Sequence, residues 1–85
     1  MSKVVLYTKA YCPFCQRALA LLESKGVNYT NIDIGVHPER RDEMIDKANG
    51  GYTVPQIFIN DEHIGGCDDM MAIEAQGLLD AKLNA

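Results

Sequence analysis

The sequence predicts an α/β fold in which a four-stranded mixed β-sheet is flanked by helices, in the order β-α-β-α-β-β-α. Short runs of β-branched and aromatic residues alternate with segments of helical periodicity, which is typical of this class. A strand, a helix and a second strand lie within about 30 residues of one another, and this spacing predicts a parallel pair. Two later strands are separated only by a tight turn, which predicts an antiparallel hairpin. The chain has 85 residues, the size of one domain, so we expect a single domain over residues 1–85.

The N-terminal part of the chain is expected to contain a strand, a helix and a second strand. Residues 3–8 (KVVLYT) are a compact apolar run, which predicts a short buried strand. Pro13 suits the first turn of a helix, and Gly26 is a common helix end. Between them, apolar residues recur at helical spacing: Cys15, Ala18, Leu19 and Leu22. Residues 27–34 (VNYTNIDI) have apolar residues at alternate positions and predict the second strand.

A second helix and a third strand follow. The helix is expected to begin at Pro38 and to stop at residues 49–51 (NGG), because proline favours a helix start and glycine a helix end. Its inner face is expected to consist of Met44, Ile45 and Ala48. Residues 56–60 (QIFIN) predict the third strand.

The C-terminal part of the chain is expected to form a hairpin and a closing helix. Asp61 and Glu62 are expected to form the tight turn, and residues 63–66 (HIGG) begin the fourth strand. Residues 68–83 carry acidic groups at their N-terminal end, where the helix dipole favours them, and predict a helix. Gly77 lies inside this segment and is expected to weaken or split the helix.

The composition argues against several classes of function. The formal net charge is −4 and the basic residues are scattered, so we expect no binding to nucleic acid. No apolar run approaches the ~20 residues that span a bilayer, and the N-terminus lacks the apolar region of a secretory signal. We therefore expect a cytoplasmic protein without membrane contact. In that compartment thiols stay reduced, and a Cys-x-x-Cys pair is more often catalytic or metal-binding than a structural disulfide.

Cys12 and Cys15, with Pro13 between them, lie at the expected start of the first helix. Backbone N–H groups and the positive end of the helix dipole favour a negative charge there, so they favour the thiolate of Cys12. Cys15 lies one turn further along, on the inner face, and lacks this advantage. We therefore expect Cys12 to attack a disulfide and Cys15 to resolve the intermediate. Lys9 and the Cys15 S–H are candidates for further stabilisation of the Cys12 thiolate.

Two other roles for the cysteine pair agree less well with the sequence. A four-ligand zinc site needs a second pair of ligands, but Cys67 is alone, and His37 and His63 follow no metal-binding spacing. A purely structural role is disfavoured because a residue at a helix start is partly exposed. We expect no metal, place both histidines at the surface, and favour thiol–disulfide exchange, which a Cys-x-x-Cys at a strand–helix junction indicates.

Three segments resemble the signatures of glutaredoxins, and more narrowly those of the small bacterial dithiol class. They are TKAYCPFC (8–15), TVPQIFI (53–59) and HIGGCDD (63–69), in this order along the chain. The resemblance implies a thioredoxin-like fold and a glutathione-dependent thiol–disulfide oxidoreductase. Its implied substrates are protein–glutathione mixed disulfides and protein disulfides, its co-substrate is glutathione, and it is expected to act as a monomer.

The same resemblance implies a set of glutathione-binding residues: Lys9, Phe14, Thr53, Val54, Pro55, Gly66, Cys67, Asp68 and Asp69. Val54 would precede a cis proline and pair through its backbone with the extended tripeptide. The N–H groups of residues 66–69 would take one glutathione carboxylate, and Lys9 the other. Asp68 or Asp69 would meet the glutathione amine, unless the two aspartates only cap the last helix.

Two positions depart from the commoner family pattern. Phe14 stands where tyrosine is more common, which keeps the ring and removes the hydroxyl, so we expect modest effects on rate. Cys67 is an extra thiol, and it is either a small half-buried residue at a helix start or a site of glutathionylation or of a link between chains. The alternative function is that of an iron–sulfur cluster or metal carrier, with one cysteine and one glutathione from each of two chains. Pro13 disfavours this alternative.

Overall fold

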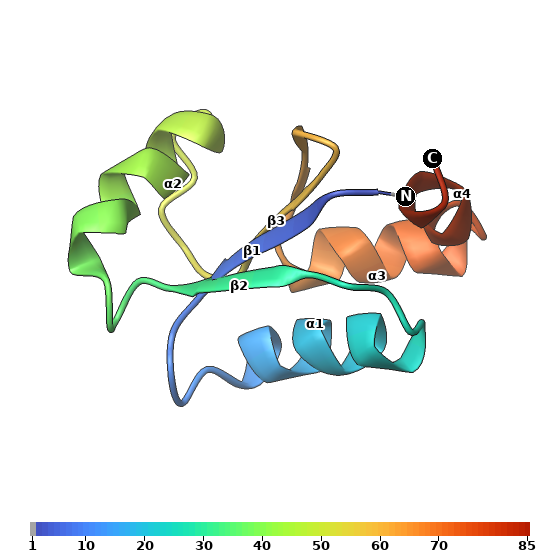
Figure 1. Cartoon of the computed structure of the whole chain (residues 1–85), viewed down its shortest axis with the longest axis horizontal. Helices are drawn as coiled ribbons and strands as arrows, with labels where there is room; N and C mark the ends of the chain where they lie inside the picture. The colour runs from blue at the N-terminus through green and yellow to red at the C-terminus, as the bar shows by residue number, and fades with distance from the viewer. Residues whose placement is uncertain (1) are drawn as a thin grey trace.

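A mixed β-sheet with helices packed on both faces is the framework of the molecule (Figure 1). The computed structural model describes residues 2–85. Its elements are, in chain order, β1 (Val4–Thr8), α1 (Pro13–Ser24), β2 (Thr30–Asp33), the 3₁₀ turn η1 (Pro38–Arg40), α2 (Arg41–Lys47), β3 (Gln56–Ile59), β4 (Glu62–Gly65), α3 (Cys67–Ala75) and α4 (Leu79–Leu83).

The sheet has the strand order β2-β1-β3-β4. β1 runs parallel to β2 and antiparallel to β3, and β3 and β4 form an antiparallel hairpin. The predicted four-stranded mixed sheet, with its parallel pair and its hairpin, is therefore confirmed. In the hairpin the register shifts between Ile57 and Phe58, since Ile57 pairs with Gly65 and Phe58 pairs with His63. Ile64 is thus an extra residue on β4, which is a β-bulge.

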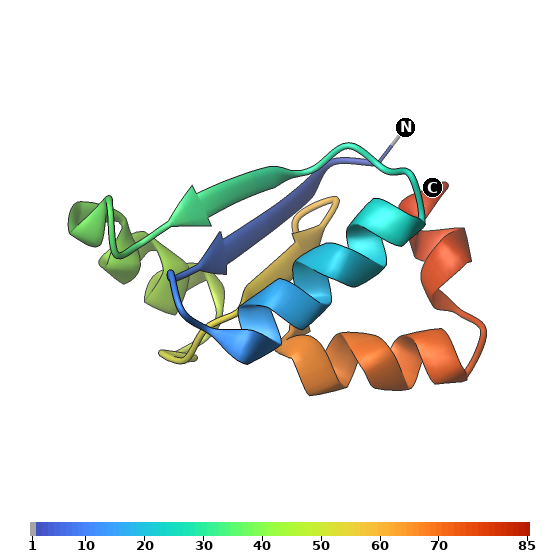
Figure 2. The same ribbon diagram turned by 90° about the horizontal axis from the view of Figure 1, so that it is seen from below.

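The two central strands are buried on both faces, because α1 and α3 cover one face and α2 covers the other (Figures 1 and 2). Leu6 and Ile57 point to the first face, and Tyr7 and Phe58 point to the second, as the period of two in a strand requires. The core on the first face consists of Val4, Leu6, Ala18, Leu22, Ile57, Ile59, Cys67, Met70, Leu79 and Leu83. The core under α2 consists of Tyr7, Ile32, Ile34, Met44, Ala48 and Phe58.

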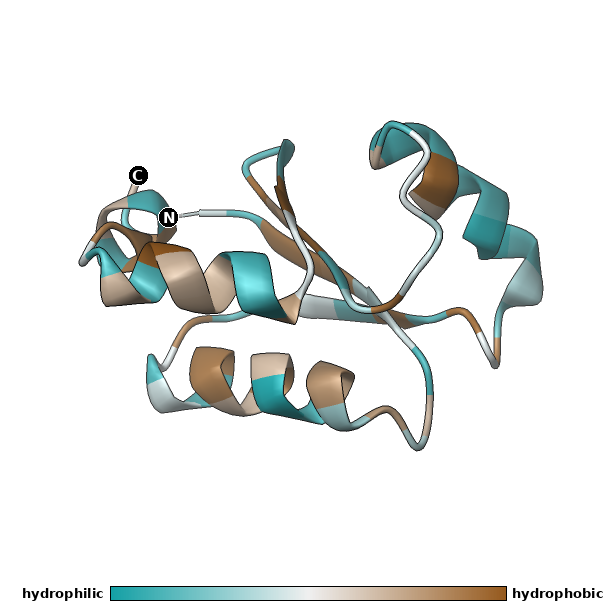
Figure 3. Cartoon of the chain, turned by 180° about the vertical axis from the view of Figure 1, so that it is seen from behind, coloured by the Kyte–Doolittle hydropathy of each residue, from teal (hydrophilic) through white to brown (hydrophobic). Residues whose placement is uncertain are grey.

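The helices differ in how much apolar surface they bury. Figure 3 shows that α2 is hydrophilic over most of its length with one hydrophobic turn, whereas α1 carries hydrophobic residues along its length. Met44 is the buried residue of α2, and Ile45 is half-buried beside it. Val4 of β1 and Leu83 of α4 share the first-face core, and just before β1 the Ser2 Oγ donates to the Lys82 carbonyl at 2.9 Å. None of the helices in residues 2–85 has the length and apolar content needed to cross a membrane.

Several element boundaries differ from the sequence predictions. β2 is shorter than residues 27–34, because only residues 30–33 pair with β1, while Val27 and Tyr29 pack from the preceding loop onto the first-face core. The segment predicted to be helical from Pro38 begins with the 3₁₀ turn η1, and the α-helix starts at Arg41. The last helix is split at Gly77, whose φ of 74° separates α3 from α4, and this prediction is confirmed.

The hairpin turn was expected at Asp61 and Glu62, and this expectation is wrong by one residue. The turn consists of Asn60 and Asp61, which have φ values of 51° and 67°, and Glu62 already belongs to β4. Two successive positive φ values are the requirement of the tightest hairpin turns, and asparagine and aspartate tolerate them best. The Asn60 side chain also accepts the Lys3 N–H at 2.8 Å, which ties the turn to the start of β1.

The three segments that resemble glutaredoxin signatures, residues 8–15, 53–59 and 63–69, come together at one end of the sheet. β1 ends there at Thr8, β3 begins there at Gln56, and β4 ends there at Gly65, because both pairings are antiparallel. The loop into α1, the loop before β3 and the start of α3 are therefore neighbours in space although they lie far apart in the sequence.

Candidate active site

Cys12 is the N-cap residue of α1, with an extended backbone (φ −110°, ψ 105°) and Pro13 in the first turn. Its sulfur accepts the backbone N–H of Cys15 at 3.2 Å, and its carbonyl accepts the N–H of Gln16 at 3.0 Å. The side chain is half-buried, so the sulfur is reachable from solvent. A sulfur that caps a helix N-terminus faces N–H donors and the positive end of the dipole, and both stabilise a thiolate.

Cys15 has the opposite surroundings. Its side chain is buried among the residues of α1 that face the sheet. Burial, together with the hydrogen bond to Cys12, raises the pKa of the Cys15 thiol to about 12, although a hydrogen bond with the Lys9 backbone partly offsets both effects. Cys15 therefore remains a protonated thiol at neutral pH. The two sulfurs, one turn apart, therefore differ in environment: the Cys12 sulfur is stabilised as a thiolate, and the Cys15 sulfur is kept as a thiol. This difference is what a nucleophile and a resolving thiol require.

A groove of about 350 Å³ lies beside Cys12. The Cys12 sulfur is 3.9 Å from the carbonyl oxygen of Val54, and the Val54–Pro55 peptide bond is cis, as the resemblance implied. The groove is lined by Phe14, Thr53, Val54, Pro55, Gly66, Cys67, Asp68 and Asp69. The structure thus brings together every predicted glutathione residue except Lys9, which is exposed in the loop before Cys12 and does not line the groove.

The start of α3 distinguishes the two aspartates. Asp69 Oδ2 accepts the backbone N–H of Gly66 at 2.9 Å, so Asp69 caps the helix. Asp68 is exposed, and its carboxylate has no hydrogen bond or ion pair within residues 2–85. The Asp69 carboxylate lies where a side chain at Gly65 would be, because a Cβ there would overlap with Asp69 Oδ2. Gly65, with a φ of 115°, is therefore required by both its backbone conformation and its neighbour.

Cys67 is the first residue of α3 and is buried in the first-face core, although it also lines the groove. Burial raises the pKa of its thiol, and Asp68 raises it further, while Arg17 lowers it. Within the described chain no group of three or more His, Cys, Asp and Glu side chains is arranged to hold a metal ion.

The Phe14 ring, which lines the groove, is in contact with a guanidinium. The Phe14 side chain is 51% exposed, and the Arg17 guanidinium lies 5.7 Å from its ring centroid, which is a cation–π contact. Arg17 was not identified from the sequence, where it reads as a residue on the solvent face of the helix. The spacing of three between Phe14 and Arg17 is the only signal that could have linked them.

The sequence also gave no role to Gln56, and it placed His63 at the surface. The surface placement of His63 is wrong, because its ring is half-buried and stacks on Phe58 with ring centroids 5.0 Å apart. His63 Nε2 lies 2.7 Å from Gln56 Oε1, and Gln56 Nε2 donates to the Thr53 carbonyl at 3.0 Å. The one available signal was a polar residue at the start of an otherwise apolar strand, since a buried amide needs partners.

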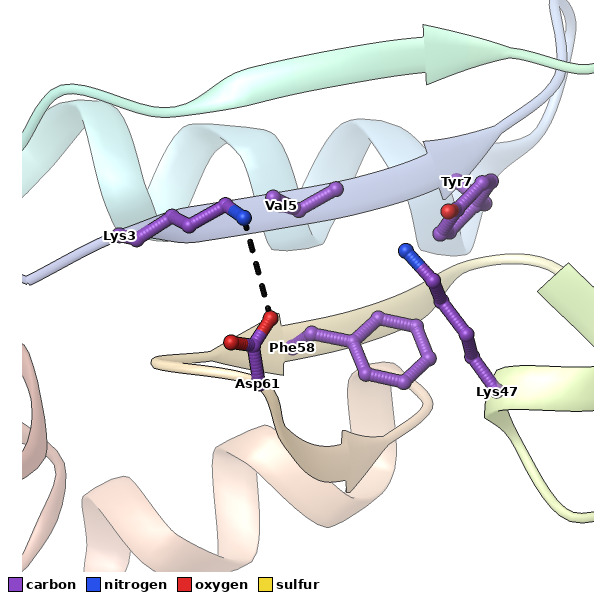
Figure 4. A pocket seen from close by; sticks show the side chains of 6 residues that line it. All are labelled: Lys3, Val5, Tyr7, Lys47, Phe58 and Asp61. Carbon is purple, nitrogen blue, oxygen red and sulfur yellow. Dashed lines mark ion pairs between the residues drawn. The ribbon is translucent and has the colours of Figure 1, made fainter. Parts of the chain in front are cut away.

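A second hollow, of about 300 Å³, lies on the other face of the sheet beside α2 (Figure 4). It is lined by Lys3, Val5, Tyr7, Lys47, Phe58 and Asp61, and Lys3 forms an ion pair with Asp61 at 3.8 Å. None of the cysteines lines it, so the thiol chemistry belongs to the groove beside Cys12.

One end of the mixed sheet holds a helix-capping thiol, a buried second thiol and a groove with a cis proline. Together these features define a thiol–disulfide oxidoreductase of the thioredoxin fold. The sequence profile of the family described as Glutaredoxin matches residues 4–64. The chain belongs to the glutaredoxin family. Glutaredoxin 3 of Escherichia coli K12 is 53% identical over 83 residues, which are 98% of this chain and 99% of that protein. A glutaredoxin of Pseudomonas aeruginosa is 52% identical over 85 residues, which are the whole of both chains.

Solved structures agree with this assignment. The crystal structure of a buckwheat glutaredoxin–glutathione complex superposes with a TM-score of 0.88 at 30% identity, covering 98% of this chain and 77% of that one. The chain is a small glutaredoxin of the bacterial type, with the thioredoxin fold, and is a glutathione-dependent thiol–disulfide oxidoreductase. The predictions of fold class, family and activity are confirmed, and the cluster-carrier alternative is not favoured.

Proposed function

We propose that Cys12 is the nucleophile, that Cys15 is the resolving thiol, and that glutathione lies in the groove beside Cys12. The observation that carries this proposal is the position of the Cys12 sulfur, which accepts the Cys15 N–H at 3.2 Å and lies 3.9 Å from the Val54 carbonyl. One stabilised sulfur therefore lies at the edge of a groove large enough for a small peptide.

The proposed reaction has two exchanges. The Cys12 thiolate attacks the glutathione sulfur of a protein–glutathione mixed disulfide, a Cys12–glutathione disulfide forms, and the protein leaves as a thiolate. A second glutathione thiolate then attacks the glutathione sulfur bound to Cys12, which releases oxidised glutathione and restores the Cys12 thiolate. For a disulfide within a protein, the Cys12 thiolate attacks one sulfur and the other sulfur leaves as a thiolate. The Cys15 thiol then gives up its proton to the released thiolate or to water and attacks the Cys12 sulfur of the mixed disulfide. The second substrate sulfur leaves as a thiolate, and the enzyme is left with a Cys12–Cys15 disulfide.

Backbone groups and a few charges would hold the tripeptide. Val54 would pair with glutathione like an added strand, and the N–H groups at the start of α3 would take one of its carboxylates. The exposed Asp68 supports a contact with the glutathione amine, since Asp69 is engaged with Gly66. Lys9, three residues before Cys12, would reach the other carboxylate with its long side chain. Phe14 and Thr53 would complete the walls.

The proposed substrates, oligomeric state and cellular compartment follow from this thiol–disulfide exchange. We propose glutathionylated and disulfide-bonded proteins as substrates, action as a monomer, and one domain over residues 1–85. We place this activity in the cytoplasm, because the reaction consumes reduced glutathione and needs a reducing compartment. The net charge of −4 supports a protein that binds neither nucleic acid nor anionic membranes.

The test compares the wild type with Cys12→Ser, Cys15→Ser and Cys67→Ser in the glutathione-dependent reduction of a glutathionylated peptide. We expect Cys12→Ser to be inactive, and Cys15→Ser and Cys67→Ser to retain activity. With a disulfide-bonded protein as substrate, Cys15→Ser should accumulate a trapped mixed disulfide. Activity in Cys12→Ser, or loss of deglutathionylation in Cys15→Ser, would contradict the assigned roles.

A further inference from the structure

We infer that Gln56 and His63 are positioning residues that fix the direction of the Val54 backbone N–H, the donor offered to the peptide part of glutathione. This inference rests on the proposed binding of glutathione along Val54, and it adds two residues that have no direct contact with the groove. Neither Gln56 nor His63 lines the groove; Gln56 contacts Thr53 in the loop of residues 51–55, and His63 contacts Gln56.

The first step of the argument is the hydrogen bonding of Gln56. Its side chain is 5% exposed at the start of β3, and its Nε2 donates to the Thr53 carbonyl at 3.0 Å and to Thr53 Oγ1 at 3.4 Å. In a trans peptide unit the C=O and the next N–H point in opposite directions. Because the Thr53 carbonyl points inward to Gln56, the Val54 N–H points away from Gln56. Within residues 2–85 this N–H has no hydrogen-bond partner, and Val54 lines the groove.

The second step is the role of His63. A carbonyl oxygen only accepts hydrogen bonds, so the Gln56 amide must turn its nitrogen to Thr53 and its oxygen to His63. His63 Nε2, 2.7 Å from Gln56 Oε1, is therefore the donor, and the ring carries its proton on Nε2. Stacking on Phe58 holds the ring in the required plane, with an interplanar angle of 29°. His63 thus prevents the Gln56 amide from turning over, since the reversed amide would direct its oxygen at the Thr53 carbonyl oxygen and its nitrogen at the Nε2–H donor of His63.

The third step is the packing of the loop onto this pair. A Cβ at Gly51 would come within 3.0 Å of Gln56 Nε2 and within 3.1 Å of the Ala48 side chain. The loop between α2 and β3 is thus closely packed against the Gln56 amide. The bulge at Ile64 sets the pairing of Phe58 with His63, so the hairpin, the amide and the loop form one rigid connection that ends at Thr53.

The experiment uses Gln56→Met, which keeps the length and removes both polar groups, and His63→Leu, with His63→Gln as the conservative variant that can still donate. Gln76→Met, on an exposed glutamine at the end of α3, is the matched control. Two rates are measured below the melting temperature of every variant. One is kcat/KM for a glutathionylated peptide, and the other is the rate at which Cys12 reacts with 4,4′-dithiodipyridine, a disulfide without glutathione.

We expect Gln56→Met to lower kcat/KM for the glutathionylated peptide by about tenfold, which is the upper range for the loss of one hydrogen bond. His63→Leu should lower it by about threefold to fivefold, and His63→Gln should restore most of it. Adding His63→Leu to Gln56→Met should have no further effect, because His63 acts only through Gln56. The reaction with dithiodipyridine and the control variant should be unchanged.

Equal losses in both reactions, or additive losses in the double variant, would overturn the inference, because they would indicate general damage to the fold. A Gln56→Met variant that fails to fold leaves the test to His63→Leu and His63→Gln, and no difference between those two would also overturn it. A binding measurement separates this inference from the proposed reaction. In Cys12→Ser protein labelled with nitrogen-15, S-methylglutathione should shift the Val54 amide signal, and Gln56→Met should weaken that binding. Unweakened binding refutes the positioning role alone, whereas a wild type inactive on the glutathionylated peptide refutes the reaction alone.

Discussion

Asp68 and Asp69 are adjacent at the start of α3, and substituting each by alanine separates helix capping from glutathione binding. Asp69 accepts the Gly66 N–H at 2.9 Å, whereas Asp68 is exposed without an intramolecular partner in the described chain. Both carboxylates lie in the first turn, where they interact with the helix dipole. The two variants therefore lose the same dipole interaction, but only Asp69→Ala loses a hydrogen bond.

The expected magnitudes follow from these contacts. Loss of a side-chain cap costs about 1 kcal/mol, and loss of a charge at a helix N-terminus costs about 0.3–1 kcal/mol. Asp69→Ala should thus destabilise the fold by roughly 1–2 kcal/mol, and Asp68→Ala by only about 0.3–1 kcal/mol. In a domain of this size about 1 kcal/mol corresponds to a shift in Tm of roughly 4–8 °C.

The assay is thermal unfolding followed by circular dichroism, together with the reduction of a glutathionylated peptide far below the Tm. Asp68→Ala should keep the wild-type Tm within a few degrees, yet lose about threefold to fivefold in kcat/KM, as an exposed ion pair worth up to about 1 kcal/mol predicts. Asp69→Asn, which keeps one acceptor oxygen, should recover part of the Tm lost in Asp69→Ala. Equal loss of Tm in Asp68→Ala and Asp69→Ala would refute the distinction between the two carboxylates.

Two further predictions concern Gly65 and Cys15. Gly65→Ala should destabilise the fold by more than about 2 kcal/mol, since it combines a backbone conformation that alanine rarely adopts with an overlap between the new Cβ and Asp69 Oδ2. The matched Gly26→Ala, with a φ of 69° and no atom within 4 Å of the new Cβ, should cost only about 1–2 kcal/mol; equal urea midpoints for the two variants would contradict this. Burial raises the pKa of the Cys15 thiol to about 12, above its value of about 8.5 in the unfolded chain. The contribution of this protonated thiol to folding stability is therefore intact below about pH 8.5 and is lost as pH rises towards 12. Urea unfolding with reductant at pH 8, 9 and 10 should show stability falling by up to about 1.4 kcal/mol per pH unit, and the fall should be smaller in Cys15→Ser; an identical slope in the variant would refute the assignment.

The features that could be predicted from the sequence are those with a local cause. The start of α1 at Pro13 and the position of Cys12 before it follow from the chemistry of a helix N-terminus, which acts over one turn. The split of the last helix at Gly77 also has a local cause, because a single residue with positive φ ends a helix wherever it lies. The parallel pair and the hairpin could also be predicted, although the full strand order was not, since short connections restrict which strands can be neighbours.

The features that could not be predicted depend on register and on contacts across the sheet. The pairing of Phe58 with His63 requires the bulge at Ile64, and no local signal in residues 62–65 indicates an extra residue there. The hydrogen bond between His63 and Gln56 depends on that register. The different roles of Asp68 and Asp69 likewise depend on the direction in which each carboxylate leaves the first turn of α3, and two identical adjacent residues carry no sequence signal of that difference.

The proposed site depends both on features with a local cause and on features set by register, because its binding groups belong mainly to the backbone. The Cys12 sulfur is held by a backbone N–H, the groove presents the backbone of Val54, and the start of α3 presents further N–H groups. A site made of backbone donors tolerates changes in its exposed side chains, so replacement of an exposed group such as the Phe14 ring should alter rates modestly. It is sensitive to residues that set the path of the chain, which here are Gln56 behind Val54 and Gly65 before α3. The residues that matter most to glutathione selectivity are therefore expected to include some that never touch glutathione.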